Sequence, residues 1–328
     1  MREVPIIDVS PLFEDTTSQR KDIIKEEIRA ACEHSGFFYI KNSNVSSKLV
    51  ETLEAKSREF FIEPQEKKQE IAMPLSKNAW RGYFKVGDEL TSGKKDQKEG
   101  IYFGTEDEAT DTRPLRGKNL WPDGDFLKSE VLEYMGLMKT LGHALLDAID
   151  PSLHEHYKEE PTELFRIFNY PKPVPDDAKD DEVYGVGEHT DYGFLTILYQ
   201  SQAGLQVKIE GEWVDVPPVP GTFVVNLGDA LEHYTRGRLV ATPHRVLYTG
   251  RLEEQTDRIS FPYFFDPNWN AYMSPRPLAD GEILGKRQKE RWDKADPRDF
   301  RGQYGEYLKR KISKVFPALF ETALVGGP

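Results

Sequence analysis

The sequence has little cysteine, little positive charge and no long apolar stretch. Cys32 is the single cysteine among 328 residues, so no intramolecular disulfide can form. Lysine and arginine total 44 against 56 aspartates and glutamates, which gives a formal net charge of −12. Nucleic acid and anionic lipid both require a basic partner surface, so this charge balance disfavours them. We therefore expect a reduced, cytoplasmic setting and a small-molecule substrate, with no nucleic-acid or membrane partner.

Apolar runs long enough for a membrane and several catalytic motifs are also missing. No stretch approaches the ~18 apolar residues of a membrane span, and the opening "MREVPIIDVSPLF" lacks the apolar centre of a signal peptide. The patterns G-x-x-x-x-G-K, G-x-S-x-G and H-E-x-x-H are absent. Their absence argues against a phosphate-binding loop, a hydrolase elbow and a zinc peptidase helix. We expect a monomer or a weak homo-oligomer.

Hydrophobic periodicity predicts helices towards both ends of the chain and strands between them. Apolar residues recur at helical spacing over residues 17–35, 46–62 and 126–150, and again in "QYGEYLKRKISKVFPAL". "VPIIDVS" and "FFYIKN" indicate early strands, and residues 74–125 indicate loops and short strands. After residue 161, short runs such as "FLTILYQ" and "TFVVNLGD" alternate with Gly, Pro and Asp turns. This spacing is typical of a β-sandwich or barrel, so we expect a mainly β fold with flanking helices that share one core.

A histidine and an aspartate stand one residue apart in "GVGEHTDYGFLTIL". If this stretch is a strand, His189 and Asp191 point to the same face. A second histidine would complete two imidazoles and one carboxylate, a set that leaves open coordination positions and suits non-haem Fe(II). We choose His244, because it opens the later β-patterned run in "ATPHRVLYTG". The other histidines lie in expected helices, in the charged stretch "HEH", expected to face solvent, or in "LEHYTRG", expected to be a turn. His189, Asp191 and His244 are called the triad below.

An arginine and a serine form a second pair with strand spacing. In "DRISF", Arg258 and Ser260 share one face of a predicted strand. An inward arginine in a β core is costly unless it meets an anion, and its planar fork binds a carboxylate through two hydrogen bonds. A metal with open positions beside such an anchor fits a chelating keto acid with a second carboxylate, which is the shape of 2-oxoglutarate.

With these motifs the chain resembles the isopenicillin N synthase-like family of Fe(II)/2-oxoglutarate-dependent oxygenases. The resemblance extends over most of the chain, through "VPIIDVS", "GFFYIKN", "RGYF", "DQKEGIYFG", "GLQV", "NLGD", "ATPHRV" and "RISFPYFFDP". It implies a double-stranded β-helix, a jelly-roll and cupin-like core, over residues 161–270. It also implies an N-terminal non-haem dioxygenase region at 1–125, a long helix at 126–160 and a C-terminal helical segment at 271–328.

The resemblance also implies a role for each motif. The triad binds Fe(II), which activates O2, and Arg258 and Ser260 hold the distal carboxylate of the cosubstrate 2-oxoglutarate. Tyr170 corresponds to a family tyrosine that touches this cosubstrate, although this chain has "FNYP" where many relatives have two tyrosines before the proline. The implied activity couples decarboxylation of 2-oxoglutarate to succinate with hydroxylation, desaturation or cyclisation at a C–H bond of a small molecule.

Strand parity and family position nominate substrate contacts. If the tyrosine of "FNYP" points inward, Phe168 and Arg166 point inward as well. Arg166 then either pairs with an acidic side chain or anchors a substrate carboxylate. Tyr83 and Tyr102 fall in the region that lines the substrate cavity of the family, and Phe265 is a further candidate in the predicted core.

Three alternatives stay open at this stage. A family oxidase that does not use 2-oxoglutarate, like isopenicillin N synthase or aminocyclopropanecarboxylate oxidase, has the same triad and Arg-x-Ser. A β-barrel could bind a metal without catalysis. Zinc also accepts two histidines and a carboxylate.

Overall fold

The computed structural model describes residues 3–91, 94–107, 115–172, 184–247, 256–277 and 301–315. The helices, α or 3-10 (η), are η1 (Ser10–Leu12), α1 (Ser18–His34), α2 (Ser47–Phe61), α3 (Gln65–Gln69), η2 (Met73–Ala79), η3 (Asp123–Asp125), α4 (Lys128–Ile149), η4 (Pro151–Leu153), α5 (His154–Tyr157), α6 (Asp229–Tyr234) and α7 (Tyr304–Val315). The strands are β1 (Ile6–Asp8), β2 (Phe37–Lys41), β3 (Gly82–Phe84), β4 (Leu90–Thr91), β5 (Lys94–Lys95), β6 (Glu99–Gly104), β7 (Pro161–Tyr170), β8 (Tyr184–His189), β9 (Leu195–Gln200), β10 (Leu205–Ile209), β11 (Glu212–Asp215), β12 (Thr222–Leu227), β13 (His244–Leu247) and β14 (Arg258–Asn268).

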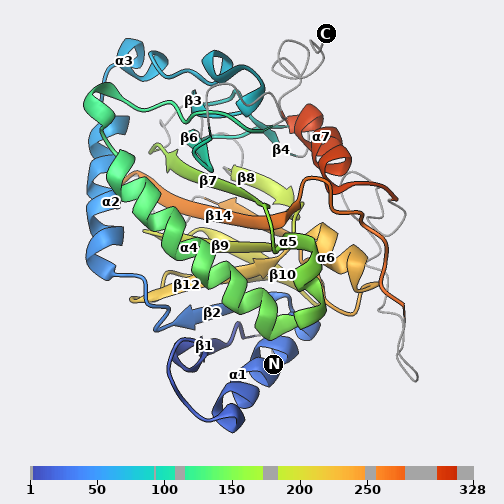
Figure 1. Ribbon diagram of the computed structural model, residues 1–328. Helices are drawn as coiled ribbons and strands as arrows, with labels where there is room; N and C mark the ends of the chain where they lie inside the picture. Colours follow the sequence, from blue (N-terminus) through green and yellow to red (C-terminus); the bar gives the residue numbers. More distant parts are fainter. Residues whose placement is uncertain are drawn as a thin grey trace.

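Twelve of the described strands form a large and a small sheet with a cavity between them, and β4 and β5 pair as a separate two-stranded sheet. The large sheet has the order β1-β2-β12-β9-β14-β7-β6-β3, and the small one has the order β11-β10-β13-β8. One cavity is lined by residues of both sheets, including Leu198 and Pro262 from the large sheet and Val186, Leu205 and Val246 from the small one. The two sheets therefore face each other, and the chain has the double-stranded β-helix core expected from the sequence (Figure 1).

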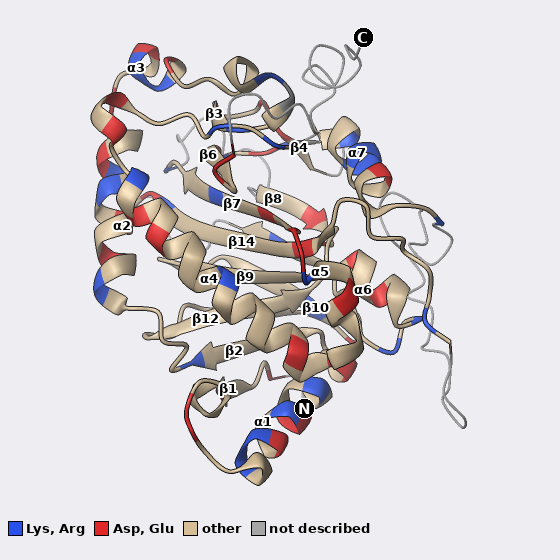
Figure 2. Ribbon diagram, viewed as in Figure 1, with Lys and Arg blue, Asp and Glu red and all other residues tan. Residues whose placement is uncertain are grey.

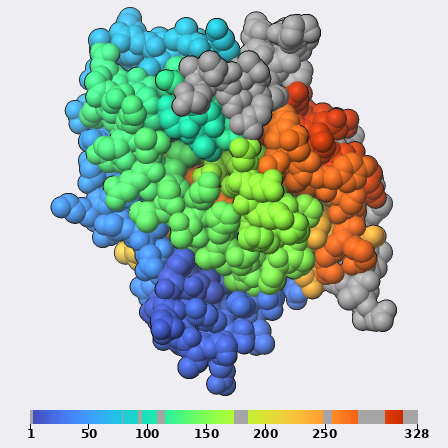
Figure 3. Space-filling model, viewed as in Figure 1, coloured from blue at the N-terminus to red at the C-terminus, as the bar shows by residue number. Residues whose placement is uncertain are grey.

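Helix α4 covers the outer face of the large sheet. It crosses in front of β14 and β9 in Figure 1 and buries Val131, Met138 and Leu145 along one side. Gly142 allows the close approach, because a Cβ at this position would lie 2.7 Å from Cγ of Phe265 on β14. In the space-filling view the green segment that includes α4 lies between the blue N-terminal region and the orange and red C-terminal part (Figure 3).

The distribution of charged residues agrees with a core of strands that is covered by helices. Lysine, arginine, aspartate and glutamate mark α1, α2, α3 and α7, whereas β9 and β12 carry none of them (Figure 2). Strand β10 alternates buried and half-buried residues, in agreement with one covered face. Among the described helices, none combines the length and the apolar character that crossing a membrane would require.

The elements predicted from periodicity are confirmed, with exceptions at three histidine-containing segments. Helices α1, α2, α4 and α7 and strands β1 and β2 lie within the predicted ranges. The predicted turn at "LEHYTRG" is wrong, because His233 lies in α6 and contacts the carbonyl of Met273 at 3.0 Å. The solvent-facing prediction for "HEH" fails for His156, whose ring lies 4.8 Å from that of Tyr234. The third exception concerns the triad and is described next.

Candidate active site

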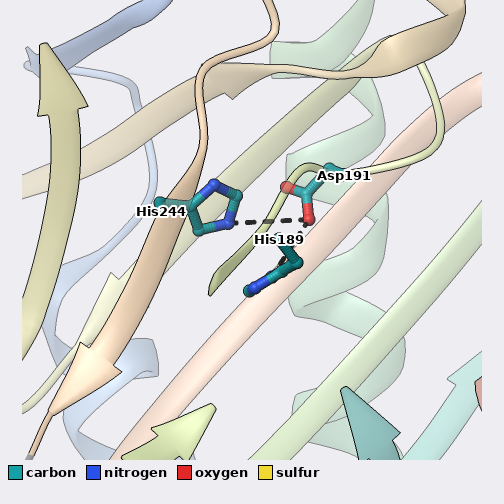
Figure 4. Close-up of side chains that lie close together, drawn as sticks. All are labelled: His189, Asp191 and His244. Carbon is teal, nitrogen blue, oxygen red and sulfur yellow. Dashed lines mark ion pairs between the residues drawn. The ribbon is translucent and has the colours of Figure 1, made fainter. Parts of the chain in front are cut away.

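The triad converges inside the cavity. Nε2 of His189 lies 3.8 Å and Nε2 of His244 lies 3.7 Å from the same carboxylate oxygen, Oδ1 of Asp191 (Figure 4). One potential ligand atom from each residue lies within 4.8 Å of the other two. His244, the histidine chosen from the sequence to complete the set, stands on β13 directly opposite His189 on β8.

The path that brings His189 and Asp191 together differs from the prediction. Strand β8 ends at His189, and Asp191 lies in the connection to β9. The two side chains therefore meet because the chain turns after the strand, and the prediction that both belong to one strand is wrong. In this connection Gly193 packs tightly against β14, where a Cβ would overlap the carboxylate of Asp266.

Neighbouring groups orient each of the three side chains. Nδ1 of His189 lies 2.8 Å from the Gly187 carbonyl and Nδ1 of His244 lies 3.1 Å from the Thr242 carbonyl, so both Nε2 atoms face the cavity. Thr196 on β9 donates to Oδ2 of Asp191 at 2.5 Å, and Asn226 on β12 donates to the same oxygen at 2.7 Å. Because both hydrogen bonds engage Oδ2, the other carboxylate oxygen, Oδ1, faces the two imidazoles. Sequence reasoning missed Thr196 and Asn226, because single polar residues in apolar strands give no local signal.

The protonation states suit a cation. Burial, and after it the neighbouring His189, lower the pKa of His244 to about 4, so its imidazole is neutral and able to bind a metal. Burial alone would raise the pKa of Asp191, but the two histidines and two hydrogen bonds outweigh it and hold that pKa below its usual value. Two imidazoles and one carboxylate on one side of a metal form the facial set of non-haem iron sites, which the donor atoms here match.

A cationic anchor lies in the same cavity as the triad. Arg258 and Ser260 are 4% and 1% exposed and line the cavity from one face of β14. Arg258 donates to the Gln202 carbonyl at 3.2 Å and to Oε1 of Gln200 at 3.0 Å, and it stacks on the ring of Tyr170 at 4.8 Å. The structure therefore brings the three predicted cosubstrate residues together, with the guanidinium held in place by neutral partners.

Strand parity along β7 brings the next candidates to the cavity wall. Arg166 and Phe168 line the cavity together with Tyr170 and are 2% and 9% exposed. Tyr102 on β6 also lines it. These positions follow from the two-residue period of β7 and its pairing with β6, in which Tyr102 lies opposite Arg166.

Two of the nominated substrate residues do not reach the cavity. Tyr83 turns away and donates to Oε2 of Glu99 at 2.5 Å. Phe265 lies on the outer face of β14, with its ring 4.8 Å from that of His143 on α4. Its neighbour Phe264 lines the cavity instead, because even-numbered residues of β14 share the face of Arg258. The parity argument used for β7 would have identified Phe264.

The remaining cavity wall comes from the N-terminal region and α7. It includes Trp80, Glu89, Lys98 and Leu308. The cavity has a volume of about 150 Å³. Sequence reasoning did not find Glu89 and Lys98, because they lie in short irregular segments among many charged residues. Residues 173–183, which follow β7 in the chain, lie outside the described residues.

Comparison with known proteins finds relatives that match nearly the whole chain. Residues 4–124 match the N-terminal region of the non-haem dioxygenase of morphine synthesis, and residues 162–267 match the 2OG-Fe(II) oxygenase superfamily. A probable iron/ascorbate oxidoreductase of Dictyostelium discoideum is 42% identical, over 99% of this chain and 98% of its own. A 1-aminocyclopropane-1-carboxylate oxidase of Dictyostelium mucoroides is 35% identical over 97% and 96%. A full-length Neurospora crassa protein, solved in complex with alpha-KG and 5-formyluracil, is 27% identical, with a TM-score of 0.77 over 95% and 96%.

Proposed function

Because the chain belongs to the 2OG-Fe(II) oxygenase superfamily, we propose that it couples oxidative decarboxylation of 2-oxoglutarate to succinate with oxidation of a C–H bond in a small molecule. The observation that carries the proposal is the presence of the triad and the Arg258–Ser260 pair in one cavity. A metal site alone would fit many proteins. A buried guanidinium with a hydroxyl beside it adds recognition of a dianionic cosubstrate.

Each group has a defined task in this proposal. The triad holds the metal, and iron, when bound, supplies the chemistry of O2 reduction. Arg258 and Ser260 bind the distal carboxylate of 2-oxoglutarate, and the ring of Tyr170 fixes the plane of the guanidinium. Apolar side chains of the cavity wall, such as Val186 and Val246, keep water from the reacting atoms.

A second candidate follows from the relatives. Two of them are named as an iron/ascorbate oxidoreductase and a 1-aminocyclopropane-1-carboxylate oxidase. The same triad and anchor would then serve an oxidase that takes electrons from another donor. Hydroxylation, desaturation and cyclisation are all compatible with the site.

Succinate production tests the proposal. Protein loaded with Fe(II) under nitrogen is titrated with 2-oxoglutarate by calorimetry, then exposed to air, and succinate is measured by mass spectrometry. We expect saturable binding and succinate formation in the wild type, and neither succinate nor oxygen uptake in His244→Ala. Oxygen uptake with ascorbate but without 2-oxoglutarate binding would establish the oxidase alternative. Metal binding with no oxygen uptake under either condition would leave a non-catalytic metal protein.

A further inference from the structure

A second buried arginine lies in the cavity, and its surroundings differ from those of a structural arginine. Nη1 of Arg166 donates to two backbone carbonyls, those of Phe165 at 3.3 Å and Phe103 at 3.5 Å. Among the described residues, no acidic side chain forms an ion pair with Arg166, although the residue is 2% exposed. A fully desolvated guanidinium with such long bonds to neutral groups is incompletely compensated.

Arg81 shows how the same chain compensates a buried arginine that has a structural role. It is 1% exposed, pairs with Asp107 at 3.5 Å and donates to the carbonyls of Gly117 at 2.8 Å and Leu115 at 2.9 Å. Arg81 lies outside the cavity of the triad. Because Nε of Arg81 also lacks a hydrogen-bond partner among the described residues, the feature that distinguishes Arg166 is its place in the cavity wall, where a ligand can supply an acceptor.

Aromatic rings fix the plane of the Arg166 guanidinium. Its Cζ lies 3.5 Å from the ring centre of Tyr102, 4.6 Å from that of Trp80 and 5.7 Å from that of Phe264. Such stacking covers the faces of the guanidinium and leaves its N–H groups in the plane. Planar N–H groups bind a carboxylate through two parallel hydrogen bonds. The ligand group that suits Arg166 is therefore a carboxylate.

Negative charge lies beside this arginine in the same wall. Glu89, which is 9% exposed, lines the cavity, and its Oε2 lies 2.9 Å from Nζ of Lys98. Lys98 also forms an ion pair with Asp96, so one ammonium group serves two carboxylates. Burial raises the pKa of Asp96 to about 6, and Glu89 adds to the rise while Lys98 opposes it. Negative charge is thus in excess around Lys98.

Tyr102 interacts with both charges. Burial raises the pKa of its phenol, the Glu89 carboxylate adds to the rise, and the Arg166 guanidinium, whose Cζ lies 3.5 Å from the ring centre, opposes it. Arg166 and Lys98 line the cavity together with the carboxyl groups of Glu89 and Asp266, so this wall has distinct positive and negative poles. A simple carboxylic acid would meet repulsion from Glu89 beside its anchor. A ligand with an anionic and a cationic group matches both poles.

We propose that the primary substrate is a zwitterionic amino acid, with its carboxylate bound by Arg166 and its ammonium group bound by Glu89. This inference rests on the proposed function, since it names the molecule that the oxygenase oxidises. Strand β7, which carries Arg166, is separated from β9 only by β14. The distance between β7 and β9 is therefore two interstrand spacings, about 10 Å. Strand β9 carries Thr196, whose hydroxyl binds Asp191 of the triad. The side chain of the amino acid is directed across this distance towards the triad.

Matched ligands test the two poles separately. The standard amino acids and L-norleucine are titrated into anaerobic Fe(II)–2-oxoglutarate protein by calorimetry, and the best binder is compared with its desamino acid and its decarboxylated amine. For L-norleucine these are hexanoate and pentylamine. We expect the amino acid to bind at least tenfold more tightly than either analogue. Equal binding of the desamino acid, or no binding of any amino acid, would overturn the proposal.

Variants at each pole give the second part of the test. Arg166→Met should abolish the preference for the amino acid over the amine, whereas Glu89→Gln should abolish its preference over the desamino acid. Arg166→Lys, which keeps the charge but not the fork, should lie between wild type and Arg166→Met. These readouts are ratios of dissociation constants within one variant, so partial misfolding does not change them. Unchanged ratios in both Arg166→Met and Glu89→Gln would overturn the proposal.

Controls separate this inference from the proposed function. Arg81→Lys and Glu188→Gln change a buried arginine and a β8 carboxylate that lie outside the cavity, and they should keep the wild-type ratios. The dissociation constant of 2-oxoglutarate should stay unchanged in Arg166→Met. Amino-acid binding in a protein that does not bind 2-oxoglutarate would refute the proposed function alone. Succinate formation without amino-acid binding would refute this inference alone.

Discussion

The two ends of the cavity are built from different kinds of structure. At the metal end, His189 and His244 lie opposite each other on paired strands, and Arg258 and Ser260 follow the two-residue period of β14. At the far end, Arg166 lies on β7, whereas Glu89 and Lys98 lie in connections between short strands of the N-terminal region. The groups of the shared chemistry thus lie mostly on regular strands, whereas the negative pole that selects the substrate lies on an irregular segment.

Removing a ligand at the metal end should give the largest effect. His244→Ala deletes one of three metal-binding side chains and leaves Asp191 beside a cavity. We expect iron content, measured by elemental analysis after desalting, to fall to background, with no detectable succinate. His154→Ala removes an exposed imidazole, half of whose side chain is accessible, and should keep wild-type iron content. Full iron occupancy in His244→Ala would show that the metal end is not where we place it.

The cosubstrate anchor should give the next largest effect. Arg258→Ala removes the buried cation that lies beside Ser260, and loss of one partner of a buried charge pair costs about 2–5 kcal/mol. The KM for 2-oxoglutarate should therefore rise by roughly a hundredfold, with iron content unchanged. Arg245→Ala is the matched control, because this arginine stacks on Trp213 outside the cavity. An unchanged KM in Arg258→Ala would show that Arg258 does not bind the distal carboxylate of 2-oxoglutarate.

These two effects concern the part of the site that is most readable in the sequence. Strand spacing and chemistry restrict the choices for the triad and Arg258, even though a turn, and not a strand, joins His189 to Asp191. The mainly β core between flanking helices follows from periodicity in the same way. The position of Phe265 on the outer face of β14 could have been predicted from the two-residue period of that strand. Glu89 and Lys98 are not predictable, because no period relates them to the residues they meet across the fold.

Hydrogen bonds around the ligands should give an intermediate effect at the metal end. Thr196→Val preserves shape but removes the donor that lies 2.5 Å from Asp191. Partners that orient metal ligands typically account for about 10–100-fold in metal affinity, so the dissociation constant for Fe(II) should rise within that range. Thr222→Val on β12 is the control, because its hydroxyl donates to the Val219 carbonyl away from the triad. Equal iron affinity in both variants would show that the Thr196 hydroxyl is not needed to orient Asp191, which Asn226 also contacts.

The smallest effect should distinguish two tyrosines on neighbouring strands of the N-terminal region. Tyr83→Phe removes a hydrogen bond to Glu99. The Glu99 carboxylate still accepts hydrogen bonds from Lys68 at 2.8 Å and from Asn169 at 3.0 Å. We expect a loss of about 1 kcal/mol in the free energy of unfolding and no change in the selectivity between amino acid and desamino acid.

Tyr102→Phe should show the opposite pattern. Its ring centre lies 3.5 Å from Cζ of Arg166, and its phenol interacts with the Glu89 carboxylate, so loss of the hydroxyl disturbs the negative pole while the stacking on Arg166 remains. We expect a several-fold rise in substrate KM, comparable to the loss of one hydrogen bond, measured by succinate formation at saturating 2-oxoglutarate. Tyr83 pairs with Ile101 and Tyr102 pairs with Gly82, so the two tyrosines lie on opposite faces of the β3–β6 pair. A change of KM in Tyr102→Phe alone would show that the face of the sheet decides which of them contacts the substrate. Equal changes of KM in both variants would contradict this.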